Sequence, residues 1–356
     1  MRGVMKVGRG PGLVELHEVP DPQPGPGEVL IAVAAAAICG SDLHIFHDRH
    51  PYWPPVILGH EFAGTVAAVG EGVSGYAIGD RVVSETSTGS CGVCFLCRSG
   101  NRQICEHKRA LGIGTNGAFA HYVVAPASLL HRVPDGVPLE EAALTEPTAI
   151  AVHAIVERMK VAPGETVVIS GPGPIGLLCL QVARAAGAGL IVVSGTPTSA
   201  RLRLQVARTV GADVIVNIGE EDLVHRVLAL TDGRGADVAV ETSGAPQAVE
   251  ALPRLTRRLG RIGLLGVTGH PTVPFPADVA LFKGLEVQCS FSSKHTSWVT
   301  ALRLLASGQV RVRPLLTTAV PLERWQEAFE AQEQGRAIKT LLMPSRWPQN
   351  LAEGRG

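Results

Sequence analysis

Short apolar stretches separated by glycine and proline recur through the first 150 residues of the chain. Four of them have the length and composition of β-strands: Glu28–Val33, Gly64–Val69, Asp80–Val83 and Phe119–Val124. The longest apolar run, Val29–Cys39, is too short to span a bilayer and is typical of a buried strand. This part of the chain therefore predicts a β-rich domain.

The pattern changes near residue 150, where helical and strand-like stretches begin to alternate. A helical stretch at Thr148–Met159 precedes a strand at Thr166–Ser170, a glycine-rich turn and an apolar helix at Ile175–Ala186. The later elements that we expect are a helix at Ala200–Val210 and strands at Leu190–Ser194, Val214–Asn217, Val238–Glu241 and Arg261–Leu265. Strands that alternate with helices predict a parallel sheet with helices on both faces.

The last part of the chain predicts one more pair of helices and a strand at Ile338–Met343. We therefore expect three segments: a β-rich domain over residues 1–150, an inserted α/β domain over 151–289, and a return to the first domain over 290–356. The predicted fold class is α/β, with a doubly wound parallel sheet inserted into the β-rich domain.

The amino-acid composition and the net charge argue against several classes of protein. The chain has 356 residues, of which 46% are apolar and 18% charged, as expected for two folded domains. Lys+Arg and Asp+Glu are both 32, and this balance argues against nucleic acid or an anionic membrane as a partner. The N-terminus lacks the apolar core of a signal peptide, so we expect a cytoplasmic protein.

The glycine-rich turn follows a predicted strand and opens a predicted helix. Its sequence is Gly171-Pro-Gly173-Pro174-Ile175-Gly176. Glycines let the backbone approach a pyrophosphate, and the helix N-terminus offers free N–H donors and the positive end of a dipole. In this context the motif predicts a dinucleotide cofactor.

The end of the next strand bears on which dinucleotide binds. An acidic residue is expected there if the adenosine ribose has a free 2′-hydroxyl. The chain instead has Ser194-Gly195-Thr196, followed by Arg201 and Arg203, which favours a 2′-phosphate and hence NADP over NAD. The alternative is that both arginines are solvated and NAD binds without the acid. Two further strand ends, Thr242 and Gly266-Val267, are expected to contact the ribose and nicotinamide.

Four of the seven cysteines crowd into fifteen residues, as Cys91-x2-Cys94-x2-Cys97-x7-Cys105. Four thiolates at this spacing can close a tetrahedron around Zn²⁺ and leave no open position, so the site would be structural. An iron–sulfur cluster is the other metal centre that four thiolates could hold. In a reducing compartment the crowding indicates a metal rather than disulfides.

A second group of candidate ligands is spread along the chain. It comprises Cys39, Ser41, Asp42 and His44, then His60-Glu61, then Glu146-Pro147. A catalytic zinc needs a few protein ligands and one position open to water or substrate. Each fragment alone is weak, and only their combination with a dinucleotide motif indicates such a site.

Taken together, these motifs resemble those of a known protein family. Gly59-His60-Glu61-x2-Gly64-x5-Gly70-x2-Val73, the four-cysteine segment and the central glycine-rich turn are similar to the motifs of zinc-containing alcohol dehydrogenases of the medium-chain dehydrogenase/reductase superfamily. The resemblance extends from about Glu28 to Met343. It implies a GroES-like catalytic domain interrupted by a Rossmann cofactor domain, with the active site in the cleft between them and a homotetramer or homodimer as the assembly.

The resemblance also implies roles for individual residues. Cys39 and His60 correspond to ligands of the catalytic zinc, and Asp42 to the partner that orients His60. Glu146 stands where the sorbitol dehydrogenase branch has a carboxylate, and whether Glu61 or Glu146 binds the metal directly is left open. Ser41 and His44 correspond to a proton relay, with Glu61 beside the zinc-bound water. The implied reaction is the reversible oxidation of a polyol or secondary alcohol to a ketone.

Three other functions are compatible with the sequence to different degrees. An L-threonine 3-dehydrogenase-like enzyme is close, although that branch usually carries Asp-Pro where this chain has Glu146-Pro147. A zinc-free reductase of the same superfamily is disfavoured because Cys39, His60 and Glu146 are all present. A zinc ribbon that binds a partner without catalysis is the alternative of another class. The substrate itself is open, because Ser292-Ser293 replaces the Arg-Tyr pair typical of sorbitol dehydrogenases.

Overall fold

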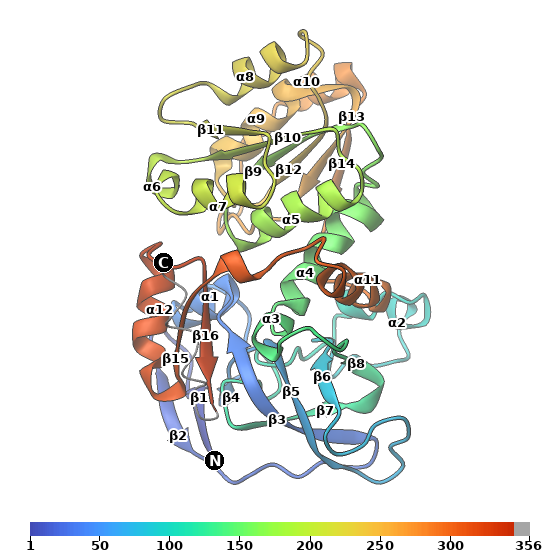
Figure 1. The fold of residues 1–356 in the computed structure, drawn as a ribbon, viewed down its shortest axis with the longest axis vertical. Helices are drawn as coiled ribbons and strands as arrows, with labels where there is room; N and C mark the ends of the chain where they lie inside the picture. The colour runs from blue at the N-terminus through green and yellow to red at the C-terminus, as the bar shows by residue number, and fades with distance from the viewer. Residues whose placement is uncertain (345–356) are drawn as a thin grey trace. The chain divides into compact units, whose positions relative to one another are not determined.

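A computed structural model describes residues 1–344, which pack as two compact units (Figure 1). Unit 1 contains Met1–Glu146 and the chain from Leu316 onward, and unit 2 contains Pro147–Leu315. Unit 2 is thus inserted between the two chain segments that form unit 1. The return begins at Leu316 rather than near residue 290, because helix α11 (His295–Ala306) belongs to unit 2, where Thr296 Oγ1 donates to Glu157 Oε1 at 2.7 Å.

Unit 1 is built on a seven-stranded sheet in the order β15-β16-β3-β5-β6-β8, with β7 paired to β3. These strands are β3 (Glu28–Ala37), β5 (Glu61–Val69), β6 (Arg81–Ser84), β7 (Tyr122–Pro126), β8 (Leu130–Arg132), β15 (Leu316–Pro321) and β16 (Lys339–Met343). Along residues 28–35 of β3, half-buried and buried residues alternate, as the period of two of a strand requires. A small sheet, β2-β1-β4, joins β1 (Arg2–Lys6), β2 (Val14–Glu18) and β4 (Val56–Ile57).

Short helices and turns of unit 1 carry the residues of interest. They are α1 (Gly40–Phe46), α2 (Phe95–Arg98), α3 (Leu139–Ala142), α12 (Trp325–Glu333) and the 3₁₀ turns η1 (Arg102–Ile104), η2 (Ala127–Leu129) and η5 (Leu322–Arg324). The core beneath them is aromatic on one side, where Phe329 of α12 lies 6.2 Å from Phe119 and 5.4 Å from Trp325 between ring centroids. This packing holds the C-terminal return against the first segment.

Unit 2 is a six-stranded parallel sheet in the order β11-β10-β9-β12-β13-β14. The strands are β9 (Thr166–Ser170), β10 (Leu190–Gly195), β11 (Val214–Asn217), β12 (Ala236–Glu241), β13 (Thr256–Leu264) and β14 (Glu286–Cys289). All of β9 is buried, as expected for a central strand covered on both faces. The strand order reverses between β9 and β12, and ligands of open α/β sheets bind at such a switch point.

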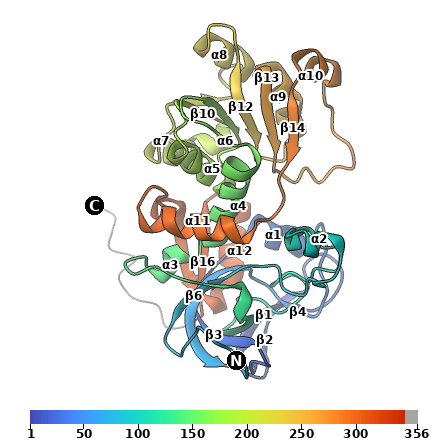
Figure 2. The same ribbon diagram turned by 90° about the vertical axis from the view of Figure 1, so that its right-hand side faces the viewer.

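Helices cover both faces of this sheet, with α5, α6 and α7 on one side and α8, α9 and α10 on the other (Figures 1 and 2). Their bounds are α5 (Pro174–Ala185), α6 (Pro197–Ala200), α7 (Arg203–Thr209), α8 (Leu223–Leu230), α9 (Pro246–Leu255) and α10 (Ala277–Lys283). The chain enters unit 2 through α4 (Thr145–Val152) and a π-helical segment η3 (His153–Arg158), and leaves through η4 (Arg313–Leu315). No helix among residues 1–344 is both long and apolar enough to cross a membrane.

One local expectation was wrong. The helix predicted at Ala200–Val210 is two helices, because Pro197 starts α6 at its first turn and Leu202, with φ −124° and ψ −64°, interrupts the helix before α7. Cys289 is exposed in β14, the edge strand of the sheet, whereas Cys179, in α5, is buried.

Candidate active site and metal centres

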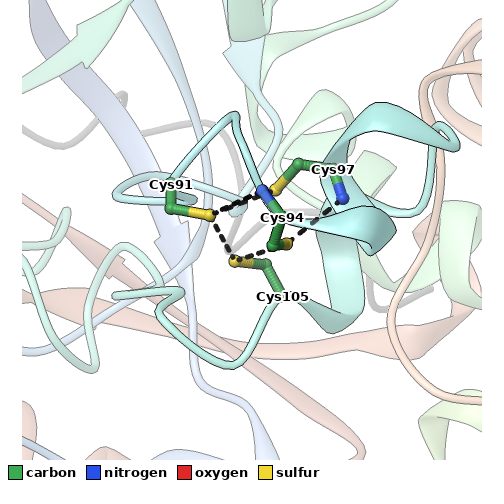
Figure 3. A group of neighbouring side chains, drawn as sticks. All are labelled: Cys91, Cys94, Cys97 and Cys105. Carbon is green, nitrogen blue, oxygen red and sulfur yellow. Dashed lines mark hydrogen bonds between the residues drawn. The ribbon is translucent and has the colours of Figure 1, made fainter.

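The four clustered cysteines point their sulfur atoms toward one another (Figure 3). Cys91 Sγ lies 3.9 Å from Cys97 Sγ and 3.7 Å from Cys105 Sγ, and Cys94 Sγ lies 3.9 Å from Cys105 Sγ. A tetrahedron with Zn–S bonds of about 2.3 Å has edges of about 3.8 Å. The thiols therefore already have the spacing of a four-cysteine zinc site, and none forms a disulfide.

Local backbone geometry explains why this segment gathers its cysteines. Gly89, Gly92 and Gly100 have φ of 63°, 70° and 79°, a left-handed conformation that glycine adopts without steric cost. Cys94 is the N-cap of α2, and its Sγ accepts a hydrogen bond from Cys97 N at 3.4 Å. The predicted spacing of the motif is therefore realised by tight turns and one short helix.

The electrostatics of the cluster also favour a cation. Hydrogen bonds from the backbone N–H groups of Val93 and Cys94 lower the pKa of Cys91 to about 6, whereas burial raises the pKa of Cys97 to about 12. Four thiols this close cannot all ionise without a positive ion between them, because like charges disfavour one another. A bound Zn²⁺ removes that penalty and deprotonates the coordinating thiols.

A second group of ligand atoms forms where β3 ends and β5 begins. Cys39 is the N-cap of α1, and His60 and Glu61 lie at the start of β5. One ligand atom from each of these residues lies within 4.8 Å of the other two. Residues that are distant in sequence thus meet because β3 and β5 pair as antiparallel neighbours, with Ala37 opposite Glu61.

The imidazole of His60 is arranged as in a metal-binding histidine. Its Nε2 lies 3.3 Å from Ser41 Oγ, and its Nδ1 lies 3.6 Å from Asp42 Oδ1. Nδ1 and Oδ1 are both buried, and neither has a hydrogen-bond partner among residues 1–344. Burial lowers the pKa of His60, but the negative charge of Asp42, the hydrogen bond and charge of Cys39 and the charge of Glu146 together outweigh it, so the net pKa lies well above the usual value. A metal on Nε2 would draw the Nδ1 proton toward Asp42, which is how a carboxylate orients a ligating histidine.

Besides lying near Cys39 and His60, Glu61 forms an ion pair with Lys339 that the sequence alone did not predict. Its carboxylate is fully buried, and Lys339 Nζ lies 2.6 Å from Oε1 and 2.5 Å from Oε2. Lys339 also donates to the Ile38 carbonyl at 2.9 Å. Residues 61 and 339 are far apart in the chain, and no local pattern signals that they pair.

Glu146, the other candidate carboxylate, lies outside this group of three. It is buried, and burial raises its pKa to about 7. The charges of His60, Glu61 and Lys339 also act on it, so it faces the same centre. In this structure Glu61 is therefore the carboxylate beside Cys39 and His60, while Glu146 approaches from α4 at some distance.

The predicted relay residues lie on α1. Ser41 and His44 are three residues apart, a spacing that places both on one face of a helix. Ser41 is half-buried next to His60, and burial lowers the pKa of His44. His47, at the C-cap of α1, lies within hydrogen-bond distance of Glu333 through its Nε2. Tyr52, which follows α1, is buried and donates to Asp48 Oδ1 at 2.5 Å.

The glycine-rich turn has the geometry of a phosphate-binding turn. Gly173 is the N-cap of α5, and Pro174 and Ile175 begin the helix. A Cβ on Gly176 would lie 1.9 Å from the Gly171 carbonyl oxygen, so only glycine fits there. The turn ends β9 at the switch point of the sheet and leaves the first N–H groups of α5 free for a ligand.

The end of β10 presents the residues predicted to meet the adenosine ribose. Thr196 is the N-cap of α6, and Arg201 is exposed in the turn that follows. Arg203, at the start of α7, has a buried Nε without a hydrogen-bond partner among the described residues. Burial also lowers the pKa of Arg203. An unpaired buried guanidinium nitrogen is costly, and an anionic ligand would satisfy it.

The ends of β12 and β13 complete the edge where the cofactor is expected. Thr242 Oγ1 donates to the carbonyl oxygens of Ser170 and Gly171 at 3.0 and 2.8 Å, so it holds the glycine-rich turn. Gly266 packs against Gly244 N, and Val267 is exposed. Of the Ser292-Ser293 pair, Ser293 accepts a hydrogen bond from Trp298 Nε1 at 3.0 Å within unit 2.

Comparison with known proteins gives consistent matches along the chain. Residues 25–135 match the family "Alcohol dehydrogenase GroES-like domain", and residues 174–307 match "Zinc-binding dehydrogenase". A sorbitol dehydrogenase from Halalkalibacterium halodurans is 40% identical, over 97% of this chain and 99% of the relative. An L-threonine 3-dehydrogenase from Pyrococcus horikoshii is also 40% identical, over 96% and 98%. A solved structure from Sinorhizobium meliloti 1021, described as a zinc-binding dehydrogenase bound to NADP, has a TM-score of 0.89 and 31% identity, over 96% and 99%.

The cysteine cluster leads to a prediction about stability. Cys97→Ser removes one ligand of a closed tetrahedral site, so the variant is expected to lose about half of its bound zinc and to unfold at a lower temperature. Zinc content by atomic emission and thermal unfolding followed by circular dichroism measure the two effects. Cys179→Ser, in the core of α5, is the control that should keep its zinc. An unchanged zinc content in Cys97→Ser would contradict a structural zinc site.

The buried pair of Glu61 and Lys339 leads to a second prediction. Lys339→Met leaves a buried carboxylate without its cation and is expected to lower the free energy of unfolding by about 3–5 kcal/mol. Urea denaturation of both proteins measures the difference. Arg324→Met, which breaks the exposed pair with Glu327, is the matched control and should cause no measurable change. Equal effects of the two substitutions would show that burial of the first pair is unimportant.

Proposed function

Because the chain belongs to the zinc-dependent alcohol dehydrogenases of the medium-chain dehydrogenase/reductase superfamily, in the sorbitol-like branch, we propose that its substrate is a polyol such as sorbitol or L-iditol. The general reaction is that of its family, which is hydride transfer between a nicotinamide cofactor and a polyol or other secondary alcohol. The observation that carries the proposal is the convergence of Cys39, His60 and Glu61, with Glu146 facing the same centre. Oxygen ligands in place of thiolates make the metal harder, which suits hydroxyl-rich substrates.

The residues are assigned roles within this proposal. Cys39 and His60 would bind the catalytic zinc, with Glu61 or Glu146 as the third ligand, and Cys91, Cys94, Cys97 and Cys105 would hold the structural zinc. When bound, the catalytic zinc supplies a Lewis acid that makes a substrate hydroxyl acidic near neutral pH. Ser41, 3.3 Å from His60 Nε2, would accept the hydroxyl proton. His44, one turn further along α1, would take that proton, and burial lowers the pKa of its imidazole.

The cofactor is a nicotinamide dinucleotide, and we propose NADP rather than NAD. Gly171, Gly173, Pro174, Ile175 and Gly176 would hold the pyrophosphate. Thr196, Arg201 and Arg203 would hold the ribose 2′-phosphate, and Thr242, Gly266 and Val267 would line the nicotinamide half. Support comes from the unpaired Nε of Arg203 and from the NADP in the similar Sinorhizobium structure.

A homo-oligomer and a cytoplasmic location complete the proposal. β14 is the last strand of the sheet order, and Val287 within it and Leu281 and Phe282 of α10 are exposed. An apolar sheet edge of this kind is suited to pairing with a second copy of the chain. The cytoplasmic location rests on the free thiols of the cysteine cluster, which a reducing compartment preserves.

L-threonine oxidation is the second candidate, because the Pyrococcus relative is as similar as the sorbitol dehydrogenase. The test is reduction of NAD⁺ and NADP⁺, followed by near-ultraviolet absorbance, with polyols, simple secondary alcohols and L-threonine as substrates. We expect reduction with polyols, abolished by a chelator and restored by Zn²⁺. Activity with L-threonine alone would replace the polyol assignment by the second candidate.

The catalytic site is tested in the same assay by Cys39→Ser. This variant is expected to lose turnover by roughly a thousand-fold while it keeps its fold, because it removes a ligand of the catalytic metal. Cys289→Ser, in the exposed edge strand, is the matched control and should retain full activity. Normal turnover in Cys39→Ser would refute the assignment of the metal ligands.

Arg203 provides a test of the cofactor choice. Arg203→Leu removes the guanidinium that would pair with the 2′-phosphate, so KM for NADP⁺ is expected to rise about ten-fold or more while KM for NAD⁺ stays the same. Arg208→Leu, on the exposed side of the same helix, is the control. The NADP proposal fails if Arg203→Leu changes neither KM.

A further inference from the structure

Glu241 is a buried carboxylate at the cofactor edge of unit 2 to which the proposed reaction gives no role. It is the last residue of β12, and only 1% of it is exposed. No ion pair with a cation is seen for it among residues 1–344. Burying an anion without a cation is costly unless hydrogen bonds replace its hydration. The structure therefore has to hold this carboxylate in place by other means.

The donors to Glu241 all come from the turn that follows it. Its Oε1 accepts hydrogen bonds from Ser243 N at 2.6 Å, from Ser243 Oγ and from Gly244 N at 2.9 Å. A side chain that bonds to its own turn in this way fixes the backbone conformation of that turn. Thr242, which lies inside the turn, is thereby held where its hydroxyl reaches the Gly171 carbonyl.

The same carboxylate also contacts the end of β13. A Cβ on Gly266 would lie 2.3 Å from Glu241 Oε2, so the absence of a side chain at Gly266 makes room for this oxygen. The Glu241 carbonyl accepts backbone hydrogen bonds from Leu265 and Gly266 at 3.0 and 3.2 Å. Glu241 thus touches two of the turns that the proposed function assigns to the cofactor, and through Thr242 it reaches the third.

We propose that Glu241 is a positioning residue for the nicotinamide cofactor: it locks the turns after β9, β12 and β13 into one rigid binding edge without touching the cofactor itself. The proposal rests on the assignment of this edge to the cofactor. Charge-assisted hydrogen bonds are about twice as strong as neutral ones, which explains why a carboxylate rather than an amide occupies the position. A pre-ordered edge binds more tightly because less conformational freedom is lost on binding.

The charge of Glu241 should affect the affinities for oxidised and reduced cofactor differently. Oxidised nicotinamide carries one more positive charge than the reduced form, and a buried carboxylate without a cation attracts positive charge over several ångströms. Removing the charge while keeping the shape should therefore weaken binding of the oxidised cofactor more than binding of the reduced one. A purely structural residue would not alter the ratio of the two affinities.

The experiment measures dissociation constants of the zinc-loaded enzyme for reduced and oxidised cofactor directly, by cofactor fluorescence and by competition. Glu241→Ala is expected to weaken binding of both forms by about ten-fold or more, since it removes all three hydrogen bonds. Glu241→Gln keeps an acceptor oxygen, so it should weaken binding of the reduced form by less than about three-fold and of the oxidised form by more. Glu250→Gln, on the solvent side of α9, is the matched control and should bind both forms normally.

Zinc content and circular dichroism accompany each variant, so that a loss of affinity caused by unfolding is recognised. If Glu241→Ala does not fold, Glu241→Gln alone decides through the ratio of the two affinities. Folded Glu241 variants that bind both cofactor forms as tightly as the unsubstituted enzyme would overturn the proposal. Failure of the unsubstituted enzyme to bind either form would overturn the cofactor assignment of this edge instead.

Discussion

A buried salt bridge between Glu61 and Lys339 joins the two chain segments from which unit 1 is built. Glu61 opens β5 and Lys339 opens β16, and β3 lies between these strands in the sheet. Because a buried charge without its partner is strongly destabilising, the buried start of β5 is stable only with β16 in place. The C-terminal return is therefore required for the candidate catalytic centre, although it contributes none of the predicted metal ligands.

The candidate catalytic centre around His60 gathers several buried carboxylates. Asp42, Glu61 and Glu146 are all buried near His60, and Lys339 forms an ion pair with Glu61. Burial raises the pKa of Asp42 and of Glu146. Such a surplus of buried acceptors is unfavourable in an apolar core but fits a divalent cation. The cysteine cluster follows the same logic in a closed form, because its four thiols leave no open position.

In unit 2 the candidate cofactor-binding edge depends on close backbone packing, whereas the candidate catalytic centre of unit 1 depends on buried charged side chains. The turns after β9, β12 and β13 meet at positions where a Cβ would collide with a neighbouring backbone, as at Gly176 and Gly244. Glycine is therefore needed both for approach to a ligand and for the contact of the turns with one another. Hydrogen bonds from Thr242 and to Glu241 then hold these turns, so the binding edge is ordered by its own polar side chains.

The sequence by itself determined the order of the elements, the doubly wound sheet, the glycine-rich turn and the four-cysteine cluster. These features depend on periodicity, turn residues and ligand spacing within a few dozen residues, and such information is local. Only the tertiary structure decided that Lys339 pairs with Glu61, that Cys289 lies on an exposed edge, and that Glu61 rather than Glu146 stands beside Cys39 and His60. Those facts depend on which strands become neighbours, and strand pairing between distant segments follows from burial of the whole core rather than from any local pattern.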